Sequence, residues 1–210
     1  MKRWWTAAVV LGIVLLDQAT KLAVKGFSLL GIEHPGMRIG ESFPLIGEAV
    51  RITFVENPGM AFGIEFGAAK IALSLFSIVA AIVLAVLLRR MHQQQVAWQI
   101  QLAIALILAG AIGNLIDRVF YGVLYGEAPL FYGRVVDFLD VDIPDIHLGS
   151  LVLQRWWVFN IADAAVSCGL ILLVLVGHQM PPLRQLLLGN PSAPASPQAR
   201  NAASEEHSAP

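Results

Sequence analysis

The sequence predicts an all-α membrane protein of four transmembrane helices, with a small β-cradle formed by two loops on one side of the membrane. Hydrophobic residues make up 57% of the 210 residues, charged residues make up only 14%, and the mean hydropathy is +0.68. This balance is far from that of a soluble domain. Four apolar runs are each long enough to cross a bilayer as a helix, which takes about twenty residues. All five tryptophans lie at the ends of these runs, where such rings anchor a protein at the membrane interface.

The expected helices cover residues 4–24, 68–88, 97–120 and 157–177. Lys2 and Arg3 precede the first run, as in a cleavable signal peptide, but no convincing small-residue cleavage site follows, so we expect a retained helix. Arg89 and Arg90, between the second and third helices, favour the cytoplasm for that loop. Basic residues after the first helix oppose this assignment, but the balance still predicts that both termini are cytoplasmic.

Two sizeable loops then lie outside, Lys25–Gly67 and Tyr121–Trp156. The first contains Val50–Val55, whose β-branched and aromatic residues predict a strand, followed by a turn at Asn57–Gly59. The second contains Val135–Val141, where alternate residues share one face of a strand. We therefore expect these loops to pair into a sheet. Residues 1–188 form the expected membrane domain, and residues 189–210, rich in Pro, Ala and Ser, form an expected disordered cytoplasmic tail.

Polar residues gather near one end of the expected helices. Ionisable groups inside a span cost at least a few kcal/mol, so each is a functional candidate. They come from three helices and the second loop: Asp17, Lys21, Asn114, Asp117, Arg118, Asn160, Asp163 and Asp137. At 1.5 Å per residue, Asp163 lies only about 9 Å below the expected start of its helix. Polar groups far apart in sequence therefore converge near the outer boundary of the membrane, as expected for a functional site.

Asp137 and Asp163 are the leading catalytic candidates. Two adjacent carboxylates suggest one acid and one base that share a proton over a water molecule. The sequence leaves open which of the two is the base.

Five motifs in this order resemble those of the bacterial lipoprotein signal peptidases (signal peptidase II): Asp17–Lys21, Glu56–Phe62, Gly113–Arg118, Val135–Phe138 and Phe159–Asp163. The resemblance covers about residues 4–178. It implies an intramembrane aspartic endopeptidase with an outer β-cradle, multi-pass in the bacterial inner membrane. The enzyme would cleave the signal peptide of a prolipoprotein on the N-terminal side of a diacylglyceryl-modified cysteine. The family's catalytic aspartates correspond to Asp137 and Asp163.

The resemblance also implies the partners. These are membrane lipids, the lipidated prolipoprotein and cyclic peptide inhibitors of the globomycin kind, and we expect a monomer. The net charge of −1 suggests no nucleic-acid partner. No cofactor is expected, and no metal site is indicated, because the histidines form no His-Glu-x-x-His motif and Cys168 has no histidine at helical spacing.

The remaining polar residues fall into three sets. We interpret Asp17 with Lys21, and Asp117 with Arg118, as scaffold, because paired opposite charges lessen the cost of burial. For a second set of residues the sequence leaves three roles open, namely substrate contact, support of the two aspartates, or a purely structural role. These residues are Asn57, Asn114, Arg118 and Asn160. We expect a third set to lie on the surface: Asp140, Asp142 and Asp145.

The linkers Val119–Arg134 and Asp140–Arg155 look longer than in compact family members. Within them, Tyr121–Tyr125 and Leu148–Leu153 are apolar enough either to rest on the membrane or to pack against the cradle.

Two other classes of function compete with the peptidase. A proton-coupled transporter would use Asp17, Asp117 and Asp163 as relay groups, but transporters place such groups near the midplane between internal repeats, which are absent here. A membrane assembly factor would need neither Asp137 nor Asp163 for cleavage. A serine peptidase lacks a Gly-x-Ser-x-Gly motif.

Overall fold

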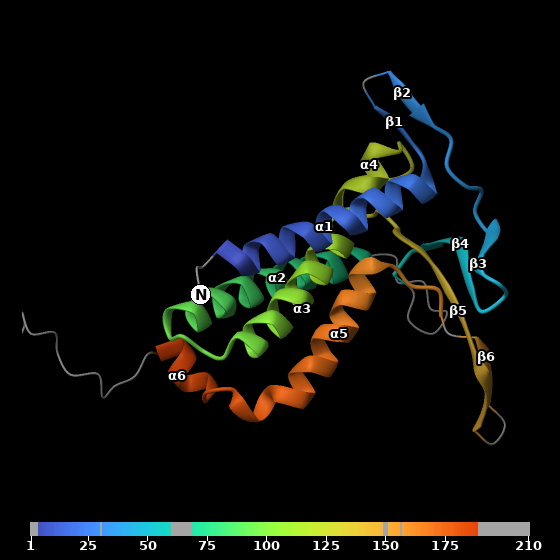
Figure 1. Ribbon diagram of the computed structural model, residues 1–210. Coiled ribbons are helices and arrows are strands. Elements are labelled where there is room, and N and C mark those ends of the chain that lie inside the picture. The colour runs from blue at the N-terminus through green and yellow to red at the C-terminus, as the bar shows by residue number, and fades with distance from the viewer. Residues whose placement is uncertain (1–3, 30, 60–68, 149–150, 156, 189–210) are drawn as a thin grey trace, which may run out of the picture. The chain divides into compact units, whose positions relative to one another are not determined.

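The computed structural model describes residues 4–29, 31–59, 69–148, 151–155 and 157–188 (Figure 1). The chain divides into two units, Met1–Met180 and Pro181–Pro210. The described part of the second unit holds the short helix α6 (Leu183–Leu188). The expected disordered tail, residues 189–210, lies outside the described residues.

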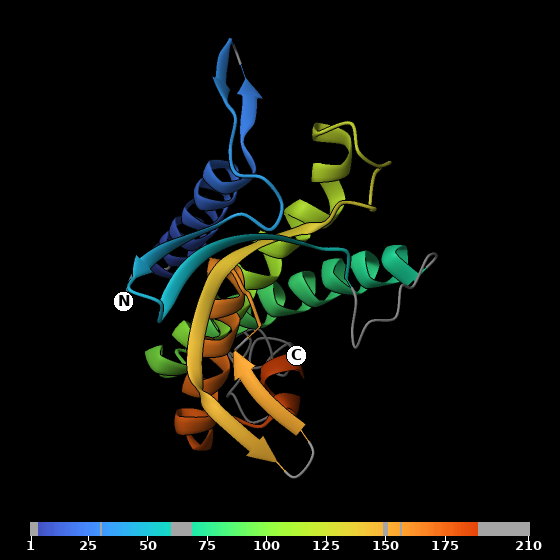
Figure 2. The same ribbon diagram turned by 90° about the vertical axis from the view of Figure 1, so that its right-hand side faces the viewer.

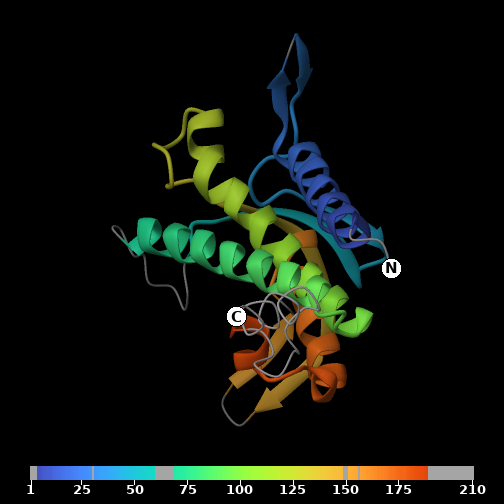
Figure 3. The ribbon, with the colours of Figure 1, turned by 90° about the vertical axis from the view of Figure 1, so that its left-hand side faces the viewer.

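Four helices of the first unit are long and apolar enough to cross a membrane, which confirms the predicted fold class. They are α1 (Trp4–Lys25), α2 (Ala69–Gln93), α3 (Trp98–Ile116) and α5 (Ile161–Val176). α1, α2 and α5 each pack against α3, which is the most buried of the four. α1 and α2 diverge from each other toward the ends of these helices that carry the strands (Figure 3).

Three of these helices differ from the sequence-based boundaries. The second was expected to end at residue 88, but α2 continues to Gln93, so Arg89 and Arg90 lie within it rather than between helices. The third was expected to reach residue 120, but α3 ends at Ile116 and continues as a π-helical turn, Asp117–Tyr121, and the short α4 (Gly122–Leu124). The fourth was expected from residue 157, but α5 begins only at Ile161, because Asn160 caps it. Asp163 therefore lies in the first turn of its helix rather than about 9 Å below the helix start. A 3-10 turn, Gly177–Gln179, follows α5.

The cradle is an antiparallel sheet with the strand order β3–β4–β5–β6. These strands are β3 (Ser42–Ile46), β4 (Val50–Asn57), β5 (Val135–Leu148) and β6 (Leu151–Arg155). The predicted pairing of the two loops is confirmed, because β4 pairs with β5 from Val50 opposite Val141 to Asn57 opposite Val135. β5 crosses the ends of the helices (Figure 2). A separate hairpin of β1 (Phe27–Leu29) and β2 (Ile32–His34) follows α1.

The longer linkers have two different structures. Most of the linker 140–155 is the β5–β6 hairpin, whose tip lies outside the described residues. In the linker 119–134, Tyr121 is buried and Tyr125 packs with it against a core that includes Phe54 and Val136. Val123 and Leu124 remain exposed. This segment therefore packs against the cradle through its tyrosines and presents its aliphatic residues outward.

Candidate active site

Asp137 and Asp163 are brought together by a short β-interaction between β5 and the residue that precedes the cap of α5. Phe159 N donates to Leu139 O at 3.0 Å, and Leu139 N donates to Phe159 O at 2.7 Å. Val136 and Phe138 are buried on one face of β5, and Val135 and Asp137 are buried on the other, so this part of β5 is covered on both faces. The pairing therefore fixes the start of α5 beside the buried part of β5.

Asn160 connects the two carboxyl groups. Its side-chain Nδ2 donates to Asp137 Oδ1 at 2.7 Å, and its Oδ1 accepts from the backbone N of Asp163 at 2.9 Å. Asp163 Oδ2 in turn accepts from Asn160 N at 3.3 Å, which completes a capping box. Asn160 thus caps α5, binds the Asp137 carboxyl with its side chain and binds the Asp163 carboxyl with its backbone N–H.

Asn114 of α3 completes this amide bridge. Its Nδ2 donates to Asp163 Oδ1 at 2.7 Å, and its Oδ1 accepts from Asn160 Nδ2 at 3.1 Å and from Lys21 Nζ at 2.9 Å. These bonds require the Oδ1 of Asn114 to face two donors, which defines the orientation of its amide. Within the described residues, neither Asp137 nor Asp163 forms a salt bridge.

A second pair of aspartates lies next to the first, with a lysine between its two carboxylates. Lys21 Nζ lies 2.9 Å from Asp17 Oδ2 and 2.7 Å from Asp117 Oδ2, and all three side chains are completely buried. The predicted Asp17–Lys21 pair is therefore present. Asp117, at the start of the π-helical turn, forms its salt bridge with Lys21 of α1, and its interaction with Arg118 is electrostatic without such a bridge.

Each of these two aspartates also holds the backbone next to a candidate catalytic residue. Asp17 Oδ1 accepts from Ala162 N at 2.9 Å, one residue before Asp163. Asp117 Oδ2 accepts from Val136 N at 3.2 Å, one residue before Asp137. The lysine-centred group therefore connects α1 and α3 to both segments that carry the candidate dyad.

The expectation from sequence did not include Gln18. Its Nε2 donates to Asp117 Oδ1 at 2.9 Å and to Gly113 O at 3.1 Å, and its Oε1 accepts from Tyr121 at 3.1 Å. A Cβ at Gly113 would lie 2.6 Å from Asp17 Oδ2, so glycine is needed for this close approach. Two signals in the sequence could have identified Gln18: its place in the Asp17–Lys21 motif and its polar side chain in an apolar helix.

The two remaining candidates lie beside the dyad. Asn57 ends β4 opposite Val135, and its Oδ1 accepts from Gly59 N at 2.9 Å, which confirms the predicted turn. Arg118 follows Asp117 and interacts electrostatically with Asp137 and Asp163. Its Nε is buried and has no hydrogen-bond partner among the described residues.

Burial and charge raise the pKa of Asp137 from 3.8 to about 7. Desolvation is the largest cause, since a buried carboxylate loses its hydration, and the neighbouring Asp163 adds to it. Hydrogen bonds from Asn160 and Asn57 act in the opposite direction. Near neutral pH, Asp137 therefore exists in both protonation states, which suits a group that must give and take a proton.

Of the three acids expected on the surface after Asp137, one differs from expectation, one agrees, and the side chain of Asp145 lies outside what the structure describes. Asp140 was expected on the surface, but it is buried, and its Oδ2 accepts from Thr53 at 2.8 Å across the β4–β5 pair. Asp142 is exposed, as predicted. Among the described residues, no group of three or more His, Cys, Asp or Glu side chains is placed to hold a metal ion.

Comparison with known proteins identifies the family. Residues 9–178 match the sequence model of the family described as signal peptidase (SPase) II. The chain belongs to the signal peptidase II family. It is therefore a signal peptidase by class and a multi-pass bacterial membrane protein.

Individual relatives agree with this assignment. A lipoprotein signal peptidase of Porphyromonas gingivalis is 36% identical over 196 residues, which cover 80% of each chain. One of Caulobacter vibrioides is 39% identical over 177 residues, covering 82% of this chain and 85% of the relative. A solved bacterial membrane enzyme superposes with a TM-score of 0.57 at 31% identity, covering 81% of this chain and 90% of that chain. The signal peptidase II fold thus accounts for both the helices and the cradle.

Proposed function

We propose that this signal peptidase is an intramembrane aspartic endopeptidase whose catalytic dyad is Asp137 and Asp163. The observation that carries the proposal is the bridge made by Asn160, which binds both carboxyl groups, while neither carboxyl forms a salt bridge with a described residue. Two close carboxylates cannot both ionise cheaply, so the pair holds one proton near neutral pH. A shared proton supplies an acid and a base at one place.

In this mechanism Asp137 carries the proton and Asp163 is the base. Asp163 lies at the N-terminal end of α5, where the helix dipole stabilises negative charge, and it accepts from Asn114 and Asn160. Burial disfavours the ionised form of Asp137. Asp163 takes a proton from water, whose oxygen attacks the scissile carbonyl carbon while Asp137 donates to the carbonyl oxygen. The tetrahedral gem-diol then breaks its C–N bond. The leaving amine takes the proton held by Asp163, and one hydroxyl returns its proton to Asp137 as the carboxylic acid product forms.

We infer that the substrate is a prolipoprotein with a diacylglyceryl-modified cysteine, cleaved on the N-terminal side of that cysteine. Relatives at 36–39% identity carry the name lipoprotein signal peptidase. The dyad lies at one end of the helices, at the first turn of α5. A lipid chain held in the bilayer would keep the modified cysteine near that depth. In the topology with both termini cytoplasmic, this end is the outer one.

The other polar residues receive roles by their contacts. Asn114 and Asn160 orient the dyad, and Asp17, Lys21 and Asp117 form its scaffold. Asn57 and Arg118 contact the substrate at the edge of the dyad. Both catalytic aspartates come from one chain, so a monomer is sufficient for cleavage. A cyclic peptide of the globomycin kind would compete for the same place.

The test is cleavage of a purified prolipoprotein in detergent, read by mass spectrometry. The expected products of the diacylglyceryl-modified form are the intact signal peptide and a protein that begins with the lipidated cysteine. The same prolipoprotein without the lipid should be cleaved far more slowly. The Asp137→Asn/Asp163→Asn double variant, purified in parallel, controls for contaminating peptidases. Equal cleavage of both substrate forms would refute the lipid requirement, and cleavage by the double variant would refute the dyad.

A further inference from the structure

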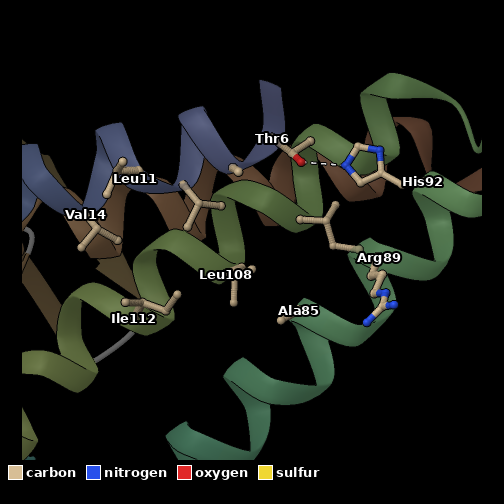
Figure 4. A pocket seen from close by; sticks show the side chains of 11 residues that line it. Thr6, Leu11, Val14, Ala85, Arg89, His92, Leu108 and Ile112 are labelled. Atoms are coloured by element: carbon tan, nitrogen blue, oxygen red, sulfur yellow. Dashed lines mark hydrogen bonds between the residues drawn. The ribbon is translucent and has the colours of Figure 1, made fainter. Parts of the chain in front are cut away.

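A cavity of about 450 Å³ lies between α1, α2 and α3, in the half of the helices away from the dyad (Figure 4). Its volume is in the range of ligand sites, about 300–1,000 Å³. Leu11 of α1 and Ala85 of α2 line it and remain exposed, so the cavity opens on the outer surface of the helices. A molecule that occupies it must therefore enter from the bilayer.

The cavity changes from apolar to basic along its length. Val14 and Ile112 line the part toward the middle of the helices, and Arg89 and His92 lie together at the other end (Figure 4). His92 Nε2 is 2.7 Å from Thr6 Oγ1, which connects the end of α2 to the start of α1. Among the described residues, no Asp or Glu lines the cavity. A cavity that is apolar over most of its length and basic at Arg89 suits a molecule with a hydrocarbon chain and an anionic head group.

The basic end lies at the level of a membrane interface. A neighbouring cavity of about 420 Å³ also includes His92, together with Trp5 and Trp98. Tryptophan rings collect at the depth of lipid headgroups. Arg89 and His92 are thus placed where a phosphate group would lie if a phospholipid chain filled the apolar part.

We propose that this cavity binds an anionic phospholipid, with one acyl chain between α1, α2 and α3 and its phosphate at Arg89 and His92. The positive charge at this end of the cavity also disfavours a signal peptide, which is the other long apolar molecule that a signal peptidase would bind. A signal peptide carries a basic segment before its apolar stretch. That segment would meet Arg89 and Arg90 at this end of α2, so like charges would oppose its binding. The lipid would connect α1 to α2 far from the dyad.

The test uses phosphatidylglycerol and phosphatidylcholine with identical chains, each titrated into the full-length protein in detergent and measured by native mass spectrometry. Wild-type protein should bind phosphatidylglycerol more tightly. Arg89→Gln should weaken that binding about fivefold, the effect of one basic residue near an anionic headgroup, and should leave phosphatidylcholine binding unchanged. Arg90→Gln is the matched control, because Arg90 is adjacent and exposed but does not line the cavity, and it should change binding less than twofold.

A second pair of variants tests the apolar part. Ala85→Trp fills the cavity and should weaken binding of both lipids, whereas Val86→Trp, at the next and exposed position, should not. Peptidase activity serves as the check that each variant is folded, since these residues are remote from the dyad. Equal losses in Arg89→Gln and Arg90→Gln would overturn the proposal, as would equal wild-type affinity for the two lipids or normal binding by Ala85→Trp. Displacement of phosphatidylglycerol by a synthetic signal peptide would assign the cavity to the peptide instead.

Discussion

Two pairs of aspartates lie next to each other at one end of the helices, and they differ in what joins their carboxylates. Lys21 stands between Asp17 and Asp117, whereas the amide of Asn160 stands between the side chain of Asp137 and the backbone of Asp163. A lysine offsets one of the two negative charges, which lessens the cost of burying the first pair. An amide carries no charge, so in the proposed mechanism the second pair shares a proton instead. The same residue type thus serves as scaffold or as proposed catalyst according to its partner.

The two pairs are also mechanically connected. Asp17 binds the backbone just before Asp163, and Asp117 binds the backbone just before Asp137. Lys21 further donates to Asn114, which donates to Asp163. The lysine-bridged pair, Asp17 and Asp117, therefore positions the segments that carry the proposed catalytic pair, and the comparison can be tested by changing one pair at a time.

The largest effect is expected in the dyad. Asp137→Asn and Asp163→Asn should each lower turnover by at least about 10²–10⁴, the usual contribution of a general acid or base, without loss of folding. The measurement is cleavage rate of the lipidated substrate per folded molecule. Asp142→Asn is the matched control, since Asp142 is an exposed acid on the same strand, and it should retain full activity. Near-normal turnover in either dyad variant would rule out the aspartic mechanism.

The lysine-bridged pair, Asp17 and Asp117, should show the reverse pattern, with a large loss of stability and a small loss of turnover. Asp17→Asn removes a buried charge from Lys21 and weakens the acceptor of Ala162 N, so we expect a loss of about 3 kcal/mol or more in the free energy of unfolding. Turnover per folded molecule should fall less than tenfold. The two quantities are measured by melting in detergent and by cleavage of the same preparation. A variant with normal melting and no turnover would move Asp17 into the catalytic group.

The pH dependence should report the proton on Asp137. Because its pKa is raised to about 7, the protonated form is lost as pH rises through 7, and turnover should decline there. Asn57→Ala removes a hydrogen bond that lowers this pKa. The decline should therefore move to higher pH, by less than about one unit for a single hydrogen bond. Pro58→Ala, in the same turn, is the control. A decline that moved to lower pH would contradict the assignment of the proton to Asp137.

The sequence predicts those features that depend on composition and spacing. The helices follow from hydropathy, and the convergence of the polar residues follows from their depth, without knowledge of which helices touch. Partners across the structure do not follow in this way. Lys21 bridges to Asp117 because α1 packs against α3, and Asp140 is buried because the β4–β5 register places it near Thr53. β1 and β2 have three residues each, too few for an alternation to be recognised.

The smallest effect is expected in an ion pair outside the membrane-spanning part of the fold. Lys25 binds Glu127 at 2.7 Å, also pairs with Glu56, and lies 4.3 Å from the ring centre of Tyr125. The Glu127 side chain is 46% exposed, so water already solvates its charge. Glu127→Gln should therefore cost less than about 1 kcal/mol and leave turnover unchanged, in contrast to Asp17→Asn. Melting of the two variants at low and high salt is the measurement, because salt screens only the exposed pair strongly. A loss for Glu127→Gln as large as that for Asp17→Asn would mean that burial is not what separates the two kinds of pair.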